Sequence, residues 1–129
     1  MTVTADSLSA LGHPARPRLI VTTDISTLTA DQGEPDDTQS LVRLLLYSCD
    51  VEIEGLIASS TMAKGRVVHG EYIRAVVHAY GQVRDRLREH SPAFPSEEEL
   101  QALVKGGNGD YGMDHVGEGQ DSEASDWII

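Results

Sequence analysis

The sequence predicts an α/β fold built on an open, mostly parallel sheet. An apolar, β-branched run at residues 18–23 precedes a helical apolar pattern at 38–48, and a second apolar run follows at 51–58. A strand, a helix and a strand in this order form a βαβ unit, with parallel strands and a right-handed crossover. Hydrophobic residues make up 40% and charged residues 24% of the 129-residue chain, which is typical of a globular protein.

Residues 1–17 are expected to form a flexible lead-in, because they are mixed and polar and contain Pro14 and Pro17. The domain would then occupy residues 18–129. The continuous apolar character of 18–23 predicts a strand that is buried on both faces, as in a parallel sheet. Asp24 ends this strand, and the small and polar residues 25–33 predict a loop.

The first helix is expected to begin near Pro35, because proline and acidic side chains favour a first helical turn. Leu41, Leu44, Leu45 and Ser48 share one face, and Val42 and Leu46 widen the apolar surface. This pattern predicts a well-buried helix. The single cysteine, Cys49, excludes an intrachain disulfide and is expected to be a buried, small apolar residue.

Three further helical segments follow the second strand. Apolar residues at helical spacing predict the longest helix over 67–87, and Ser96 with Glu99 forms a capping box for a short helix that ends near Lys105. A glycine-rich loop covers 106–119, and a last helix begins at 122–123. Trp127, close to the end of the sequence, is expected to lie in the core rather than to form a sugar-stacking platform.

Charge and hydropathy exclude some partners. The net charge is −11 and the isoelectric point is about 4.6, so nucleic acids and anionic membranes are disfavoured. No apolar run approaches the roughly 18 residues of a membrane-spanning helix. The first residues lack the basic and apolar regions of a signal peptide, so a cytoplasmic location is the default expectation.

The predicted sheet is incomplete. Two parallel strands leave faces and edges uncovered, and residues 127–129 add three large apolar side chains at the start of a helix. We therefore expect the N-terminal part of a larger α/β domain, or else a small protein that a partner completes. The isolated chain is expected to be poorly stable, to self-associate, or to pair with a missing C-terminal part.

Four acidic residues cluster where the first strand ends and the first helix begins: Asp24, Glu34, Asp36 and Asp37. Ligands of open α/β sheets bind at the carboxyl ends of the strands. Carboxylates that converge there repel one another unless a cation neutralises them, and Ca²⁺ or Mg²⁺ prefers such oxygen ligands. The alternative is that Asp36 and Asp37 only stabilise the start of the helix.

These residues resemble the nucleoside-hydrolase-like domain of the inosine–uridine nucleoside hydrolase superfamily, and more closely its cellulose-binding-protein-like branch of unknown function. The resemblance covers about residues 18–129. Its motifs are Thr22-Thr23-Asp24, Glu34-Pro35-Asp36-Asp37, residues 40–48, residues 53–58, Tyr111-Gly112-Met113, residues 116–119 and Asp121-Ser122-Glu123.

The resemblance implies a Rossmann-like open sheet, an N-glycosidic hydrolase activity and a bound Ca²⁺. By position, Asp24 matches a Ca²⁺ ligand that is also the general base, Asp37 matches a bidentate Ca²⁺ ligand, and Asp36 matches a residue that binds sugar hydroxyls. The substrate would be a small molecule or a glycan.

Four further residues are predicted to contact the substrate. Glu34 belongs to the acidic cluster, and Ser60 and Thr61 follow the second strand, where nucleoside hydrolases carry asparagine. His115 lies in the glycine-rich loop, where it could face a sugar.

The sequence differs from the family motif at several positions. Thr22 stands at the first aspartate of the family motif, Ile25-Ser26 replaces Pro-Gly, and residues 27–33 resemble an insertion. A later carbonyl ligand and a late His-Asp pair of the family site would lie beyond Ile129. The sequence therefore predicts a hydrolase domain that is truncated here. A non-catalytic carbohydrate-binding module and an inactive gene fragment are the alternatives.

Overall fold

The computed structural model describes residues 15–62 and 67–129. Most of the expected lead-in, residues 1–14, lies outside the described residues. The described elements are β1 (Arg18–Thr23), α1 (Asp36–Leu46), β2 (Glu52–Ala58), α2 (Gly70–Arg88), α3 (Glu97–Ala102), β3 (Val104–Gly106), the 3₁₀ turn η3 (Met113–His115) and α4 (Glu123–Ile128).

The strands form one parallel sheet in the order β1-β2-β3, which confirms the predicted α/β fold. In the pairing of β1 with β2, Leu19 lies opposite Ile53 and Thr23 opposite Ala58, with one irregularity after Leu19. The sequence did not predict β3, because three residues are too short to show a strand period. The predicted helix ends at Ala102 instead of near Lys105, and the chain then enters the sheet at once.

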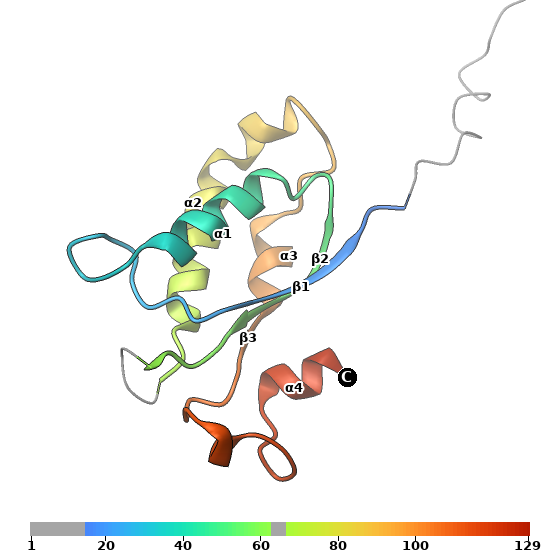
Figure 1. Ribbon diagram of the computed structural model, residues 1–129. Helices are drawn as coiled ribbons and strands as arrows, with labels where there is room; N and C mark the ends of the chain where they lie inside the picture. Colours follow the sequence, from blue (N-terminus) through green and yellow to red (C-terminus); the bar gives the residue numbers. More distant parts are fainter. Residues whose placement is uncertain (1–14, 63–66) are drawn as a thin grey trace, which may run out of the picture.

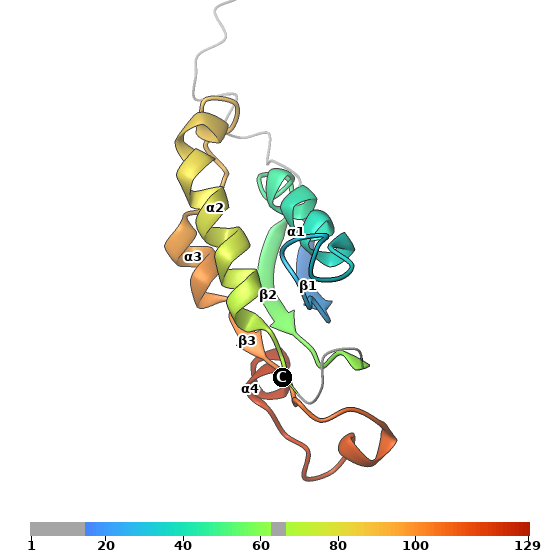
Figure 2. The same cartoon turned by 90° about the vertical axis from the view of Figure 1, so that its left-hand side faces the viewer.

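Helices lie on both sides of the sheet. Figures 1 and 2 show α1, α2 and α3 on one side of the strands and α4 on the other. The core lies between the sheet and the first group of helices. Its buried residues include Leu41 and Leu45 of α1, Ile73 and Val77 of α2, and Leu56 of β2.

β1 corrects the prediction of a strand that is buried on both faces. Its residues alternate between exposed and half-buried, and the side chain of Ile20 is 41% exposed. The physical reason is position, since β1 is an edge strand and, among the described elements, α4 alone packs on the second face.

α1 is also less buried than its sequence suggested. Leu41 and Leu45 are buried as predicted, whereas Val42 and Leu46 are about half exposed on the outer side of the helix. Ser48 is buried and donates a hydrogen bond to the Leu45 carbonyl at 2.7 Å. The helix is therefore amphipathic, and its buried apolar face is narrower than the sequence pattern predicted.

The last two helices start where the sequence predicted. Ser96 and Glu99 form the expected capping box of α3, and Ser122 with Ser125 forms a second box at the start of α4. Each box satisfies backbone N–H groups that a helix start leaves free. Among the described residues, no helix combines the length and the apolar character needed to cross a bilayer.

Trp127 lies at the surface, contrary to the prediction that it belongs to the core. Its side chain is 46% exposed, and the indole Nε1 donates to the Glu54 carbonyl at 2.7 Å. The ammonium of Lys105 lies 4.4 Å from the ring centroid. These contacts fix α4 against the second face of the sheet, which no other described helix covers.

Candidate functional site

An acidic pocket of about 630 Å³ lies at the carboxyl ends of β1 and β2. It brings together five residues predicted from the sequence, and three neighbours complete its lining. The predicted residues are Asp24, Glu34, Asp36, Asp37 and Thr61, and the neighbours are Ser26, Gly33 and Met62. The pocket therefore combines the end of β1, the start of α1 and the residues after β2.

Thr23 links the end of β1 to the start of α1. Its hydroxyl donates a 2.7 Å hydrogen bond to Asp37 Oδ2 and accepts one from the Ile25 backbone N–H at 3.1 Å. A hydrogen bond to a carboxylate is stronger than a neutral one, so this contact orients Asp37. Thr23 belongs to the motif that carries the family resemblance, but it was not among the predicted site residues, since a strand threonine carries no signal for such a contact.

The loop that resembles an insertion is anchored to the same helix. Ile25 and Thr27 are each 1% exposed, and Thr38 of α1 donates to the Thr27 carbonyl at 2.6 Å. The Thr27 hydroxyl donates in turn to the Thr29 carbonyl at 2.8 Å. The extra residues thus fold outward from an anchored base, and Asp24 and Asp37 line one pocket despite them.

The start of α1 bears on the alternative that Asp36 and Asp37 only stabilise the helix. Pro35 occupies the N-cap position, and no side chain makes a capping hydrogen bond there. Asp36 and Asp37 lie in the first turn, where the helix dipole favours negative charge. The Asp37 carboxylate instead accepts from Thr23, so it serves the pocket wall as well as the helix.

The oxygen atoms that line the acidic pocket are of the chemical type that binds a hard cation. Carboxylate oxygens, together with the hydroxyls of Ser26 and Thr61, are ligands of the kind that Ca²⁺ takes. Within residues 15–62 and 67–129, however, no three histidine, cysteine or acidic side chains gather closely enough to hold a metal ion. Asp24 and Asp37 could supply two ligands, and water or other oxygen groups would have to supply the rest.

Ser60 and His115 lie outside the lining of the acidic pocket. The Ser60 hydroxyl donates to the Asp110 carbonyl at 3.3 Å, and His115 Nδ1 lies 3.6 Å from Asp110 Oδ2. Asn108 also donates to the His115 carbonyl, at 3.4 Å. These residues tie the glycine-rich loop to the end of β2, so the structure gives them a role in holding this loop.

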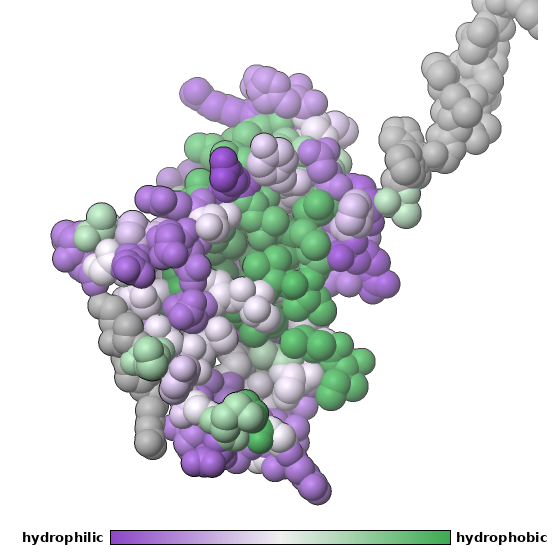
Figure 3. Space-filling view, in the orientation of Figure 1, coloured by the Kyte–Doolittle hydropathy of each residue, from purple (hydrophilic) through white to green (hydrophobic). Residues whose placement is uncertain are grey.

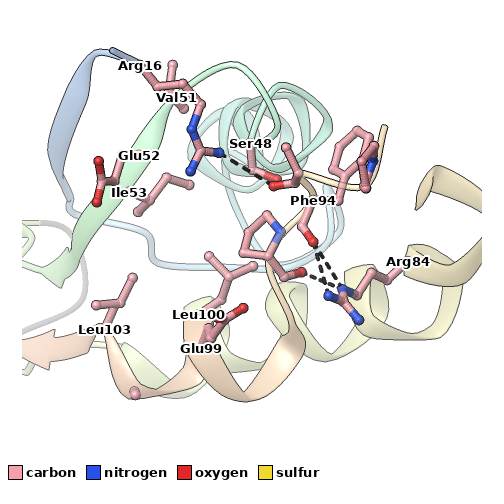
Figure 4. Close-up of a pocket in the computed structure, with 14 residues that line it drawn as sticks. Arg16, Ser48, Val51, Glu52, Ile53, Arg84, Phe94, Glu99, Leu100 and Leu103 are labelled. Carbon is pink, nitrogen blue, oxygen red and sulfur yellow. Dashed lines mark hydrogen bonds between the residues drawn. The ribbon is translucent and has the colours of Figure 1, made fainter. Parts of the chain in front are cut away.

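A second cavity, of about 620 Å³, lies near the opposite end of the sheet, around the start of β2 (Figure 4). Arg84 of α2 points into its wall, where it donates to the Phe94 carbonyl at 3.1 and 3.3 Å and to the Pro95 carbonyl at 2.7 Å. Val51, Ile53 and several apolar residues of the 92–103 segment complete the wall. None of the predicted site residues lines this cavity.

Fold and pocket together define an open parallel α/β domain with an acidic pocket at the carboxyl ends of β1 and β2. In such sheets the crevice outside these strand ends is the general position for ligands. The acidic pocket has this position, whereas the second cavity does not.

The chain belongs to the family described as "Cellulose-binding Sde182, nucleoside hydrolase-like domain", which matches residues 18–129. Among solved structures, it is similar to a nucleoside hydrolase-related hypothetical protein from Saccharophagus degradans that is associated with carbohydrate metabolism. The TM-score is 0.77 and the sequence identity 34%, over 88% of this chain. The chain spans 26% of that protein. No curated protein matches the chain.

Proposed function

We propose that the acidic pocket is the active site of a Ca²⁺-assisted glycosidic hydrolase of nucleoside-hydrolase type. The observation that carries this proposal is the convergence of Asp24, Asp36 and Asp37 on one pocket at the carboxyl ends of β1 and β2. Family membership supports the class of reaction, because the family has a nucleoside-hydrolase-like domain. The substrate would be a ribosyl or related glycosyl compound.

Each acidic residue has a separate role in the proposed reaction. Asp24, exposed at the end of β1, would take the proton from a water that attacks the anomeric carbon. Asp36, also exposed, would accept hydrogen bonds from sugar hydroxyls, and Glu34 and Thr61 would provide further polar contacts on the same wall. Asp37 would hold the cation with one oxygen while Thr23 fixes the other.

Ca²⁺, when bound, would neutralise the crowded carboxylates and orient the sugar hydroxyls. The Thr23–Asp37 hydrogen bond supports this assignment, because groups around a metal site commonly orient its carboxylate ligands through hydrogen bonds. Two carboxylates are a small ligand set, so we expect weak affinity in this chain.

Calcium titration calorimetry tests the site. Wild type is expected to bind Ca²⁺, and Asp37→Ala is expected to weaken binding about tenfold or more. The matched control is Glu98→Ala, because Glu98 is an exposed acid of α3 away from the pocket. Equal binding by wild type and Asp37→Ala would remove Asp37 from the site.

Release of nitrophenol from a nitrophenyl riboside tests the reaction. Asp24→Asn should abolish any turnover that the wild type shows, because an amide cannot take the proton from water. Turnover by Asp24→Asn equal to that of wild type would exclude Asp24 as the base.

A second candidate function is non-catalytic carbohydrate binding. It is favoured by the family description, which names a cellulose-binding protein. Sedimentation with insoluble cellulose separates the two candidates. A binding module should be retained on cellulose with or without a calcium chelator and should release no sugar, whereas a Ca²⁺-assisted hydrolase should lose its activity in the chelator.

A further inference from the structure

A shallow groove lies between α1 and α2, on the side of these helices that faces away from the sheet. Figures 1 and 2 show the two helices side by side on one face of the sheet. The groove has a volume of about 150 Å³, and none of its lining residues is charged: Val42 and Leu46 of α1, and Val76, Ala79, Tyr80 and Val83 of α2. It shares no residue with the acidic pocket or with the second cavity.

The side chains along this groove form a continuous exposed patch. Val42, Leu46 and Val83 are each about half exposed, and Ala79 beside them is exposed as well. In Figure 3, hydrophobic side chains reach the surface where the upper turns of α2 lie behind α1, between hydrophilic ones. Single exposed apolar residues are normal on proteins, whereas a continuous patch marks an interaction surface.

The sequence of α1 supplies more apolar residues than the core uses. Leu41 and Leu45 are buried in the core, and the residue that follows each of them, Val42 and Leu46, faces the groove. A surface helix of a monomer carries polar side chains on the face opposite the core. The second apolar pair has no such burial within residues 15–62 and 67–129, so it indicates a partner.

The helix layer, defined here as α1 and α2 together, is almost neutral. It contains five basic and four acidic residues, a balance of +1, whereas the whole chain has a net charge of −11. The remaining parts of two copies therefore repel each other, but their helix layers do not. Charge thus directs contact between two copies to this layer.

The distribution of charge within the helix layer also matches a second copy. Both helices carry acidic side chains in the first turn and basic side chains in the last turn. Because α1 and α2 connect successive parallel strands, they run in the same direction. A twofold axis that crosses the layer reverses the helices of the second copy, so its basic ends lie against the acidic ends of the first.

We infer that the helix layer binds the helix layer of a second copy of the chain, with the groove at the centre of the contact. α2 has 19 residues and is about 28 Å long, and two adjacent helices make a layer about 20 Å wide. The contact therefore buries at most about 500 Å² on each copy, or about 1,000 Å² in total, which is the lower limit for a specific interface. We expect a weak dimer, with a dissociation constant on the order of tens of micromolar.

Sedimentation velocity over a range of protein concentrations tests the contact. Val83→Glu brings two carboxylates into one apolar contact, because a twofold interface contains each substitution twice. This variant should associate at least about tenfold more weakly than wild type. The matched control is Val116→Glu, because Val116 is an exposed valine of the glycine-rich loop outside the groove, and this variant should associate like wild type.

A mixture of two charge variants tests whether the contact joins the same face of both copies. Val83→Glu and Val83→Lys should each associate poorly alone, since like charges then meet at the groove. An equimolar mixture should associate at least about tenfold more tightly than either variant alone, because every mixed dimer pairs opposite charges. Association through any other face would gain nothing from this mixture.

Three results would overturn the inference. They are a wild-type chain that stays monomeric at about 1 mM, which would leave the groove to a different protein, equal association of Val83→Glu and Val116→Glu, and no gain in the mixture. If circular dichroism shows that the Val83 variants do not fold, Leu46→Glu and Leu46→Lys repeat the mixture from the α1 side of the groove. All measurements are made in the chelator EDTA, since the acidic pocket lies outside the contact.

Discussion

Two cavities of nearly equal size lie at opposite ends of the sheet, about 630 Å³ at the carboxyl ends of β1 and β2 and about 620 Å³ at the start of β2. Their linings differ in kind. The first is lined by four acidic side chains, of which Asp37 alone is half-buried. The second has buried Phe94 and Leu100 in its wall and carbonyl groups held by Arg84. Size therefore does not distinguish the proposed active site from the second cavity.

The difference separates stability from chemistry. Phe94 and Leu100 of the second cavity belong to the core and Arg84 holds its wall, so their removal should destabilise the fold. The lining of the acidic pocket crowds like charges, and such crowding is expected to cost stability at a site that is kept for function. Four measurements can break or sharpen this contrast.

The largest contrast should come from a pair of truncations, one at each cavity. Phe94 is 6% exposed, so Phe94→Ala should lower the free energy of unfolding by about 3 kcal/mol through lost burial and a new void. Met62 is 75% exposed, so Met62→Ala should change the free energy of unfolding by less than about 0.5 kcal/mol. Urea unfolding followed by circular dichroism measures both. Similar losses for the two variants would contradict the contrast.

Arg84→Met should have the next largest effect. It removes three hydrogen bonds to the Phe94 and Pro95 carbonyls and should cost about 2 kcal/mol, since bonds to charged groups are stronger than neutral ones. Arg86→Met in the same helix is the control, because Arg86 is exposed. If both arginine variants unfold at the same urea concentration, Arg84 does not hold the cavity wall.

The pH dependence of stability should show a smaller effect at Glu99. Hydrogen bonding by Ser96, first its backbone N–H and then its side chain, holds the pKa of this carboxyl below its usual range, and attraction by Arg84 adds to the shift. A lowered pKa in the folded state means stability that is present at neutral pH and lost as pH falls through that pKa. Because Glu99 is largely exposed to solvent, the loss should stay below about 0.5 kcal/mol.

Glu99→Gln provides the control for this pH effect, because glutamine can also complete a capping box but does not titrate. Urea unfolding is measured for both proteins at neutral pH and at about pH 3.5. The wild type should lose slightly more stability than Glu99→Gln on acidification. A larger loss in the variant would reverse the assigned sign.

The smallest change in stability should come from Asp24→Asn. Asp24 is exposed and accepts no hydrogen bond from residues 15–62 or 67–129, so the free energy of unfolding should change by less than about 0.5 kcal/mol. Any Ca²⁺ binding of the wild type should nevertheless weaken. A loss of stability comparable with that of Arg84→Met would mean that the acidic pocket also supports the fold.

Much of this arrangement could be predicted from local patterns. The apolar runs at 18–23 and 51–58 and the helix between them gave the parallel βαβ unit, and Ser96 and Ser122 marked two helix starts. The acidic cluster was placed correctly at the end of β1, because parallel strands have their carboxyl ends at one edge. Ser60 was predicted as a substrate contact from its position after the second strand, and His115 from its position in the glycine-rich loop. The structure places both beside Asp110, outside the lining of the pocket.

The sequence by itself determined the elements and the position of the acidic residues, because helix and strand periods and capping boxes depend on residues a few positions apart. Only the tertiary structure decided that Thr23 would hold Asp37, that Trp127 would rest on Glu54 at the surface, and that β3 would join the sheet. These features join residues far apart along the chain, and only the packing of elements brings such residues into contact.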